Sequence, residues 1–287
     1  MNAGNAIKKS VPQKIYFGIC RFFMIIWSVA VLFPLIWTIY SSLKDNKGFY
    51  ANPWALPTQL HFENYYNAWI MSNVSKYFLN SMILLVIPLI LSTLMAALTA
   101  YVIAKFRVRW KKSLVIFYTV PLFIPQMIVL VPQYFLARDL HMTNSIPGLI
   151  VFYSILPTTF AALQLTAFFK GISNSLSEAA RMDGCTEFGI FFKIMLPLVK
   201  PGLATVGIVS GLTLWNEYVM ALTFLSDEKK FTVPIGIANL SAAQQFRTDF
   251  GALFAGLTIA LVPMIVLYVI FQRYLLDSTS QAGAIKG

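Results

Sequence analysis

Six long apolar runs divide the sequence, each separated from the next by a more polar stretch. Each run is long enough to cross about 30 Å of hydrocarbon as a helix that rises about 1.5 Å per residue. The pattern predicts an all-α polytopic membrane protein with six transmembrane helices and both termini on one side of the membrane. The runs are Tyr16 to Ile39, Phe78 to Ala104, Leu114 to Phe135, Gly148 to Phe169, Gly202 to Leu225 and Ala252 to Tyr274.

These runs define residues 16–274 as one transmembrane domain, preceded by a polar segment, 1–15, and followed by a tail, 275–287. Seven prolines interrupt the runs. Membrane bundles tolerate such prolines because neighbouring helices satisfy the backbone groups that they free, so we expect kinked helices. The prolines are Pro34, Pro88, Pro121, Pro125, Pro132, Pro157 and Pro263.

The composition agrees with a bilayer location, because 58% of the 287 residues are hydrophobic and only 11% are charged. So few charges cannot solvate the surface of a soluble globule of this size. The formal net charge of +11 would also suit a nucleic-acid-binding protein. The basic residues, however, lie in short loops between the apolar runs rather than along one face, which disfavours that class.

The Lys and Arg residues set the predicted orientation. With the N-terminus in the cytoplasm, fifteen of them fall inside and seven outside. The first run is too long for a secretory signal and lacks a small-x-small cleavage site, so we expect it to be retained. The prediction is a multi-pass protein of the cell membrane with cytoplasmic N- and C-termini. A tight cluster after the second run contributes most: Lys105, Arg107, Arg109, Lys111 and Lys112.

We expect no metal or cofactor on this chain. Cys20 and Cys185 fall at the cytoplasmic face, where thiols stay reduced. His61 and His141 lie in separate loops with no second ligand at a helical spacing. The sequence contains no Gly-Lys dipeptide and therefore no Walker A phosphate loop.

Two long stretches fall outside the membrane in this topology. Residues 44–77 have the pattern of a loop followed by an amphipathic interfacial helix, and residues 226–251 form a polar excursion before the last run. Each suits contact with an external partner and equally suits a plain connector.

The polar stretch Ser175 to Pro201, SLSEAARMDGCTEFGIFFKIMLPLVKP, lies on the cytoplasmic side and has the pattern of two short helices. Ser175 and Glu178 have the spacing of a capping box, and Gly184 supplies a helix terminator. Phe188, Phe191, Phe192 and Met195 then predict a second helix with an apolar face. Periodicity alone leaves two interpretations open, an interfacial connector and a surface that pushes on another protein.

Glu-Ala-Ala, Gly, Ile and Leu-Pro follow one another in this stretch at fixed spacings. The order is similar to the coupling-loop signature of binding-protein-dependent ABC importer permeases. The positions that match are Glu178, Ala179, Ala180, Gly184, Ile194, Leu196 and Pro197, and Asp183 fits the Asp-Gly of the sugar-importer branch.

Further pieces resemble the same branch, namely Phe62-Glu63-Asn64-Tyr65, Asn80-Ser81 and Trp215-Asn216-Glu217. The tail Gln281 to Gly287 is similar to the ending of the smaller maltose-type permease. Ser173 departs from the pattern, because the family often has proline there, which puts the entry angle of the first helix in question.

The resemblance implies a type I importer permease fold with a coupling helix between spans 4 and 5, in a coupling segment that we define as residues 170–201. It implies a heterodimer with a second permease, two cytoplasmic ATP-binding cassette subunits that hold ATP and Mg, and an extracytoplasmic solute-binding protein. The chain itself would not be an enzyme. The eight matched residues would meet the ATPase, with Glu178 in polar contact and small Ala179, Ala180 and Gly184 allowing close approach. Gly283, Lys286 and Gly287 in the tail would reach the ATPase dimer.

Glu217 is a carboxylate well inside a predicted span, where charge costs at least ~3 kcal/mol on insertion scales. With Trp215 and Asn216 it offers the polar groups and aromatic face that a sugar needs. We assign these three residues, with Gln126 and Gln164, to a candidate substrate pathway. The alternative for Glu217 and for the amides, including Gln133, is hydrogen bonding between packed helices.

Other classes of membrane protein fit less well. A secondary transporter would need relay carboxylates in several spans, and an enzyme would need a catalytic set that the sequence lacks. The spans carry no basic cluster for an anion, which favours a neutral sugar or oligosaccharide over a glycerol phosphodiester or a uronate oligosaccharide. The sequence leaves open which solute is carried and which permease subunit holds it.

Overall fold

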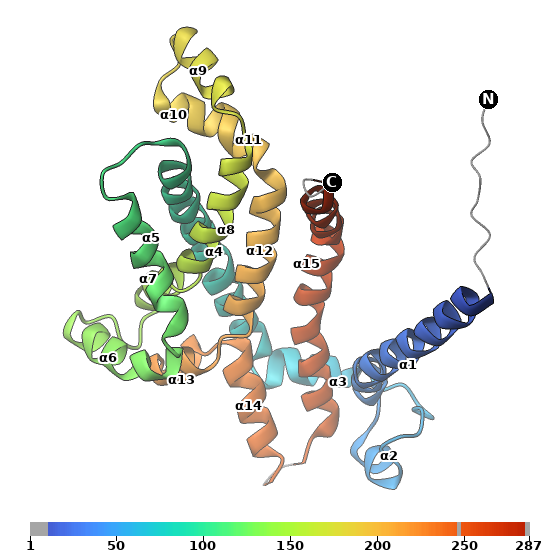
Figure 1. The fold of residues 1–287 in the computed structure, drawn as a ribbon. Coiled ribbons are helices and arrows are strands. Elements are labelled where there is room, and N and C mark those ends of the chain that lie inside the picture. Colours follow the sequence, from blue (N-terminus) through green and yellow to red (C-terminus); the bar gives the residue numbers. More distant parts are fainter. Residues whose placement is uncertain (1–10, 246–247, 285–287) are drawn as a thin grey trace.

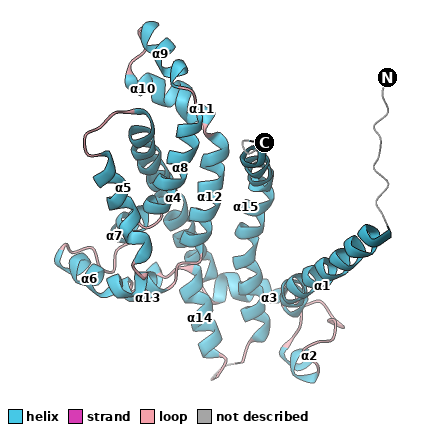
Figure 2. Ribbon diagram, in the orientation of Figure 1, coloured by secondary structure: helices cyan, strands magenta, loops and turns pink. Residues whose placement is uncertain are grey.

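The computed structural model describes residues 11–245 and 248–284, and over these residues the chain is helical without a strand (Figure 2). The all-α prediction is confirmed. Three continuous helices are long and apolar enough to cross a membrane: Tyr16–Ser41 within α1 (Val11–Ser41), α4 (Val74–Lys105), and Phe250–Ile270 within α15 (Phe250–Ala284). Three bent pairs of helices pass the same test together, which gives up to six spans if each pair is one span.

The remaining helices are shorter and connect or complete these spans. They are α2 (Asn46–Ala51), α3 (Glu63–Tyr66), η1 (Asn67–Met71), α5 (Lys111–Thr119), η2 (Val120–Phe123), α6 (Gln126–Asp139), α7 (Ile146–Ile155), α8 (Thr158–Gly171), α9 (Asn174–Met182), α10 (Glu187–Ile190), η3 (Phe191–Met195), α11 (Leu196–Leu198), α12 (Lys200–Trp215), α13 (Val219–Phe224), η4 (Glu228–Lys230) and α14 (Val233–Ala243).

The third predicted run, Leu114 to Phe135, is not one helix. The segment formed by α5 and η2 meets α6 at an angle of 106°. Ile124 and Pro125 between them have extended backbone, and Pro125 has no N–H to continue a helix. The sequence predicted kinks, but this bend turns α6 away from the direction of α5 (Figure 1).

The fifth predicted run, Gly202 to Leu225, was also wrong as a single helix. Helix α12 ends at Trp215, three residues follow outside any helix, and the short α13 begins at Val219. The fourth run is closer to the prediction, since α7 and α8 meet at 40° around Pro157.

The two stretches predicted to lie outside the membrane contain more structure than the sequence predicted. Residues 44–77 hold α2, α3 and η1. Residues 226–251 hold η4 and α14, a helix that we did not predict because its eleven residues are too few for a span. The Asn46 side-chain amide joins these stretches, since it donates to the Thr248 carbonyl at 2.8 Å and accepts from the Phe250 N–H at 2.9 Å.

One part of the core lies between α4, α8 and α12, and another lies between α4, α7, α12 and α13. Small side chains allow the backbones of α4 and α8 to approach closely. These are Ala96, Ala97 and Ala100 on α4 and Ala161 and Ala162 on α8, all fully buried. Helices α9 and α10 lie at one end of this bundle, and α2 and α14 lie toward the opposite end, while α1 extends away from it (Figure 1).

We predict that Gly148→Ala destabilises the fold. A Cβ at Gly148 would lie 2.2 Å from the Met142 carbonyl oxygen, and backbone cannot yield as a flexible side chain can. Overpacking of this kind costs about 1–3 kcal/mol, which a lowered thermal midpoint of the purified protein in detergent would report. Gly207→Ala is the matched control because nothing lies within 4 Å of a Cβ there; equal midpoints for the two variants would contradict the prediction.

Candidate functional site

The coupling segment begins with a serine cap. Ser173 has extended backbone, and its hydroxyl accepts a hydrogen bond from the Ser175 N–H at 3.3 Å, so α9 starts at Asn174. The predicted capping box of Ser175 and Glu178 is therefore wrong, because Ser175 already lies in the first turn. The residue that departs from the family pattern does the capping instead, since an extended serine hydroxyl satisfies a free N–H.

Gly184 ends α9 as predicted. Its φ is +77°, a region that glycine enters without a steric cost. The Gly184 N–H donates to the Arg181 carbonyl at 3.0 Å, and the Cys185 N–H donates to the Ala180 carbonyl at 2.9 Å. This pair of bonds is a Schellman motif, which reverses the chain toward α10.

The second helix differs from the predicted one. Thr186 caps α10 by accepting from the Gly189 N–H at 3.2 Å, and the helix then widens into the π-helical turn η3. A π-turn shifts the following side chains around the axis. Phe191 and Met195 are buried as expected, but Phe188 and Phe192 are exposed.

The buried face of the segment packs on the spans. Ala180, Ile190, Phe191 and Met195 join the core cluster that includes Ala100 and Tyr101 of α4 and Leu165 and Phe169 of α8. The prediction that Ala180 meets the ATPase is therefore corrected, because its side chain is 4% exposed and packs against this chain's own helices. Ile194 and Leu196 are half-buried, and Pro197 is exposed at the start of α11.

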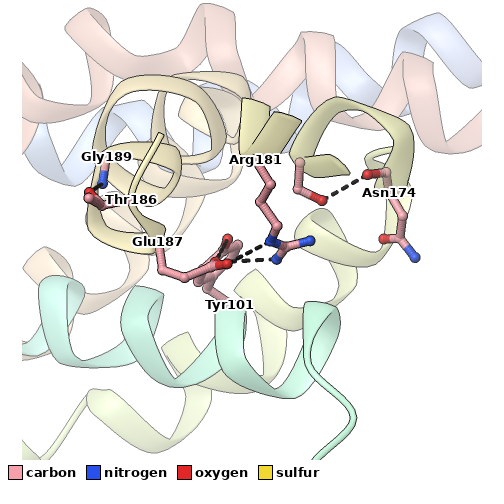
Figure 3. A network of polar contacts seen from close by, with 7 residues as sticks. Tyr101, Asn174, Arg181, Thr186, Glu187 and Gly189 are labelled. Carbon is pink, nitrogen blue, oxygen red and sulfur yellow. Dashed lines mark hydrogen bonds and ion pairs between the residues drawn. The ribbon is translucent and has the colours of Figure 1, made fainter. Parts of the chain in front are cut away.

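An ion pair bridges the reversal between α9 and α10 (Figure 3). Arg181 Nε donates to Glu187 Oε1 at 2.6 Å, and Arg181 Nη2 donates to Oε2 at 3.2 Å, while the Tyr101 hydroxyl lies 3.5 Å from Oε2. The hydrogen bond from Arg181 lowers the pKa of the Glu187 carboxyl, which keeps it ionised at neutral pH. The pair is partly exposed and contributes about 1 kcal/mol or less, so its main effect is to fix the turn.

The outward face of the segment carries both charge and apolar surface. Glu178, Ala179, Asp183 and Gly184 are exposed, as a contact with another protein requires. Met182 and Phe188 are also exposed, at 89% and 73%, and neither was predicted from the sequence as a contact residue for another protein. Spacing alone did not separate the two faces of such short helices; the exposure of large apolar side chains does.

The three residues Trp215, Asn216 and Glu217 lie at the end of α12 but do not act alike. Trp215 is 4% exposed, and its indole N–H donates to the Ala260 carbonyl of α15 at 3.2 Å, which anchors the two helices. Asn216 is exposed and lines a cavity of about 360 Å³ with residues of α1, α14 and α15, among them Thr38.

Glu217 lies in the break between α12 and α13 rather than inside a helix. Its carboxylate accepts from the Met220 N–H at 2.7 Å, the Ala221 N–H at 3.0 Å and the Tyr153 hydroxyl. These bonds satisfy free N–H groups of the first turn of α13. The geometry fits the packing alternative for Glu217.

Four of the predicted pathway residues come together in pairs. Trp215 and Asn216 line the cavity of about 360 Å³, and Gln126 and Glu217 line a small cavity of about 90 Å³. Gln164 lies in α8 and lines neither cavity. Gly283 falls within α15, which continues to Ala284, so most of the predicted tail is helical; Lys286 and Gly287 lie outside the described residues.

Comparison with known proteins gives a family match over residues 92–281, to the binding-protein-dependent transport system inner membrane component. The chain is similar to the diacetylchitobiose uptake system permease protein NgcG of Streptomyces coelicolor, with 36% identity covering 90% of this chain and 85% of that protein. It is also similar to the arabinooligosaccharides transport system permease protein AraQ of Halalkalibacterium halodurans, with 31% identity covering 89% and 91%.

A solved structure shares the fold. A chain of a bacterial ABC transporter involved in the import of the acidic polysaccharide alginate superposes with a TM-score of 0.81 at 21% sequence identity, covering 93% of this chain and 98% of that one.

We predict that Glu217→Ala lowers the thermal midpoint more than Glu217→Gln does. Alanine leaves two N–H groups and the Tyr153 hydroxyl unpaired, at about 1–3 kcal/mol per unsatisfied group, whereas glutamine keeps an acceptor oxygen. Thermal unfolding in detergent measures both, with Gln164→Ala as an intramembrane control. Equal midpoints for Glu217→Ala and wild type would show that the carboxylate does not cap α13.

Proposed function

This chain belongs to the family of binding-protein-dependent transport system inner membrane components, and from that membership we propose that it forms half of the channel of a carbohydrate importer. It is a permease subunit, and in this proposal the ATP that drives transport is hydrolysed by other subunits. In this proposal a second related permease completes the channel, two cytoplasmic ATPase subunits drive it, and an extracytoplasmic binding protein delivers the solute.

One observation supports the proposed contact with the ATPase: the coupling segment is a helical hairpin of fixed shape with one exposed face. The Schellman turn and the Arg181–Glu187 pair fix its shape, and its inner face is packed into the bundle. Glu178 supplies an exposed charge and Met182 and Phe188 supply apolar surface for a groove on the ATPase. Closure of the ATPase dimer would then move the segment and favour one arrangement of the spans over the other.

The substrate class follows from the relatives rather than from a pocket in this chain. The two permeases described above are named for the uptake of diacetylchitobiose and the transport of arabinooligosaccharides, and they are 36% and 31% identical to this chain. The alginate transporter shares the fold at 21% identity. A neutral di- or oligosaccharide fits best, with Asn216 at the edge of its cavity and Gln126 beside Glu217 as the polar groups of the pathway.

We expect ATP hydrolysis by the complete complex in lipid to rise when the binding protein and its sugar are added. Glu178→Ala and Gly184→Val should lower this stimulation at least about fivefold, because the first removes an exposed charge and the second strains a left-handed backbone. The measurement is phosphate release with a panel that includes diacetylchitobiose, arabinooligosaccharides and alginate oligomers.

Asp139→Asn is the control for that experiment, since it removes an exposed ion pair outside the coupling segment. Stimulation that is insensitive to both coupling-segment variants would argue against the ATPase contact. Stimulation by alginate oligomers alone would replace the neutral sugar with a uronate.

Met182→Asp and Phe188→Asp test the newly identified surface. Each replaces an exposed apolar side chain whose burial in a groove is worth about 1.5–3 kcal/mol, so the affinity of the ATPase for the permease should fall tenfold or more. Titration of the ATPase onto immobilised permease measures it. Leu140→Asp, at an exposed apolar residue after α6, should leave the affinity unchanged; a loss of the same size in that variant would contradict the assignment.

A further inference from the structure

Helix α4 is held at its outer end by the stretch that follows α13. The Asn80 amide donates to two backbone carbonyls, those of Lys229 and Phe231, at 3.0 Å each. The Ser81 hydroxyl accepts from the N–H of Val233 at 2.9 Å, so a residue of α4 caps the start of α14. Thr232 itself makes no side-chain cap, which leaves α14 dependent on α4 for its first turn.

The other end of α4 is held by the coupling segment. The Lys105 ammonium donates to the Ile172 carbonyl and, at 3.0 Å, to Asn174 Oδ1. These are the residues immediately before and at the start of α9. One turn earlier, the buried Tyr101 ring packs against Phe169 and Phe191, and its hydroxyl faces Glu187.

Between these ends α4 has no break. It runs from Val74 to Lys105 through Pro88, and its small residues pack closely on α8. Asn80 and Lys105 are 25 residues apart, or about 38 Å along a helix axis. A closely packed helix of this length transmits displacement rather than absorbing it, because tightly packed interiors have low compressibility.

We propose that α4 is a rigid connection that couples the position of the coupling segment to the position of η4 and the start of α14, with Lys105 and Asn80 as its positioning residues. Lys105 bonds to a backbone carbonyl and to the Asn174 side chain, and Asn80 bonds to two backbone carbonyls, so each segment follows the helix. The inference rests on the proposed function, in which the coupling segment meets an ATPase and the outer surface meets a binding protein.

The test compares Lys105→Met, Asn80→Ala and the double variant in the complete complex in lipid nanodiscs. The readout is the ratio of ATP hydrolysis with sugar-loaded binding protein to hydrolysis without it. We expect each single variant to lower this ratio about fivefold or more. The ratio of the double variant should be no lower than that of the more impaired single variant. Contacts in series behave this way, since breaking either one already disconnects the two faces.

Effects that multiply in the double variant would show that the two ends act independently and would overturn this role of α4. Single variants with wild-type ratios would overturn it as well. Lys105→Arg keeps the charge and the donors and should keep the wild-type ratio. If the charge acted only on topology, Arg107→Met, which removes another cation of the same cluster, would lower the ratio as much as Lys105→Met does. Thr99→Val is the matched control, because it removes a hydrogen bond from α4 to Tyr118 of α5 at 3.1 Å without touching either segment.

If Lys105→Met or Asn80→Ala prevents assembly, Asn174→Ala removes one of the two Lys105 bonds and Ser81→Ala removes the separate bond from α4 to the Val233 N–H, so each weakens one end of α4. The wild type separates the two levels of the proposal. If the binding protein does not stimulate ATP hydrolysis by the wild-type complex, the result counts against the proposed function. If it stimulates the wild type and all the variants equally, the result counts against the role of α4 alone.

Discussion

The backbone of a chain in hydrocarbon must satisfy its own hydrogen bonds, and the rest of this structure depends on how that requirement is met. Continuous helices meet it internally, and each place where a helix stops needs another donor or acceptor. After α12 the Glu217 carboxylate accepts from the first turn of α13. At α14 the acceptor comes from Ser81 on a different helix. These two polar side chains therefore each satisfy the first turn of a helix that follows a break in the backbone ladder.

The same requirement explains what the sequence could and could not predict. The apolar runs predicted an all-α protein with six spans, and Gly184 was correctly placed as a terminator because its role depends on local backbone sterics. A hydropathy run does not record a bend, so the 106° turn at Pro125 and the early end of α12 at Trp215 were missed. Helix α14 has eleven residues, fewer than a span needs, so the sequence predicted only a polar excursion there.

The candidate site shows a similar division. The motif residues of the coupling segment were found from their spacing, but spacing did not predict which side of the hairpin faces the bundle. Burial assigns Ala180 to the inside and Met182 to the outside. In the span break, Trp215 and Glu217 looked alike in sequence as candidate sugar contacts, yet one anchors α15 and the other caps α13. Trp215 takes its role from a carbonyl 45 residues later in the chain, and Glu217 takes its role from the start of a helix that the hydropathy pattern does not show.

The Asn46 side chain forms bonds that cannot exist until late in synthesis. It bonds to the Thr248 carbonyl and to the Phe250 N–H at the start of α15, about 200 residues later in the chain. At roughly 5–20 residues per second, the ribosome needs about 10 to 40 s to deliver its partners. Through that interval Asn46 lacks both of these bonds. Helix α15 therefore completes the fold of a loop made about 200 residues before it, and a nascent chain that stalls before α15 lacks that contact.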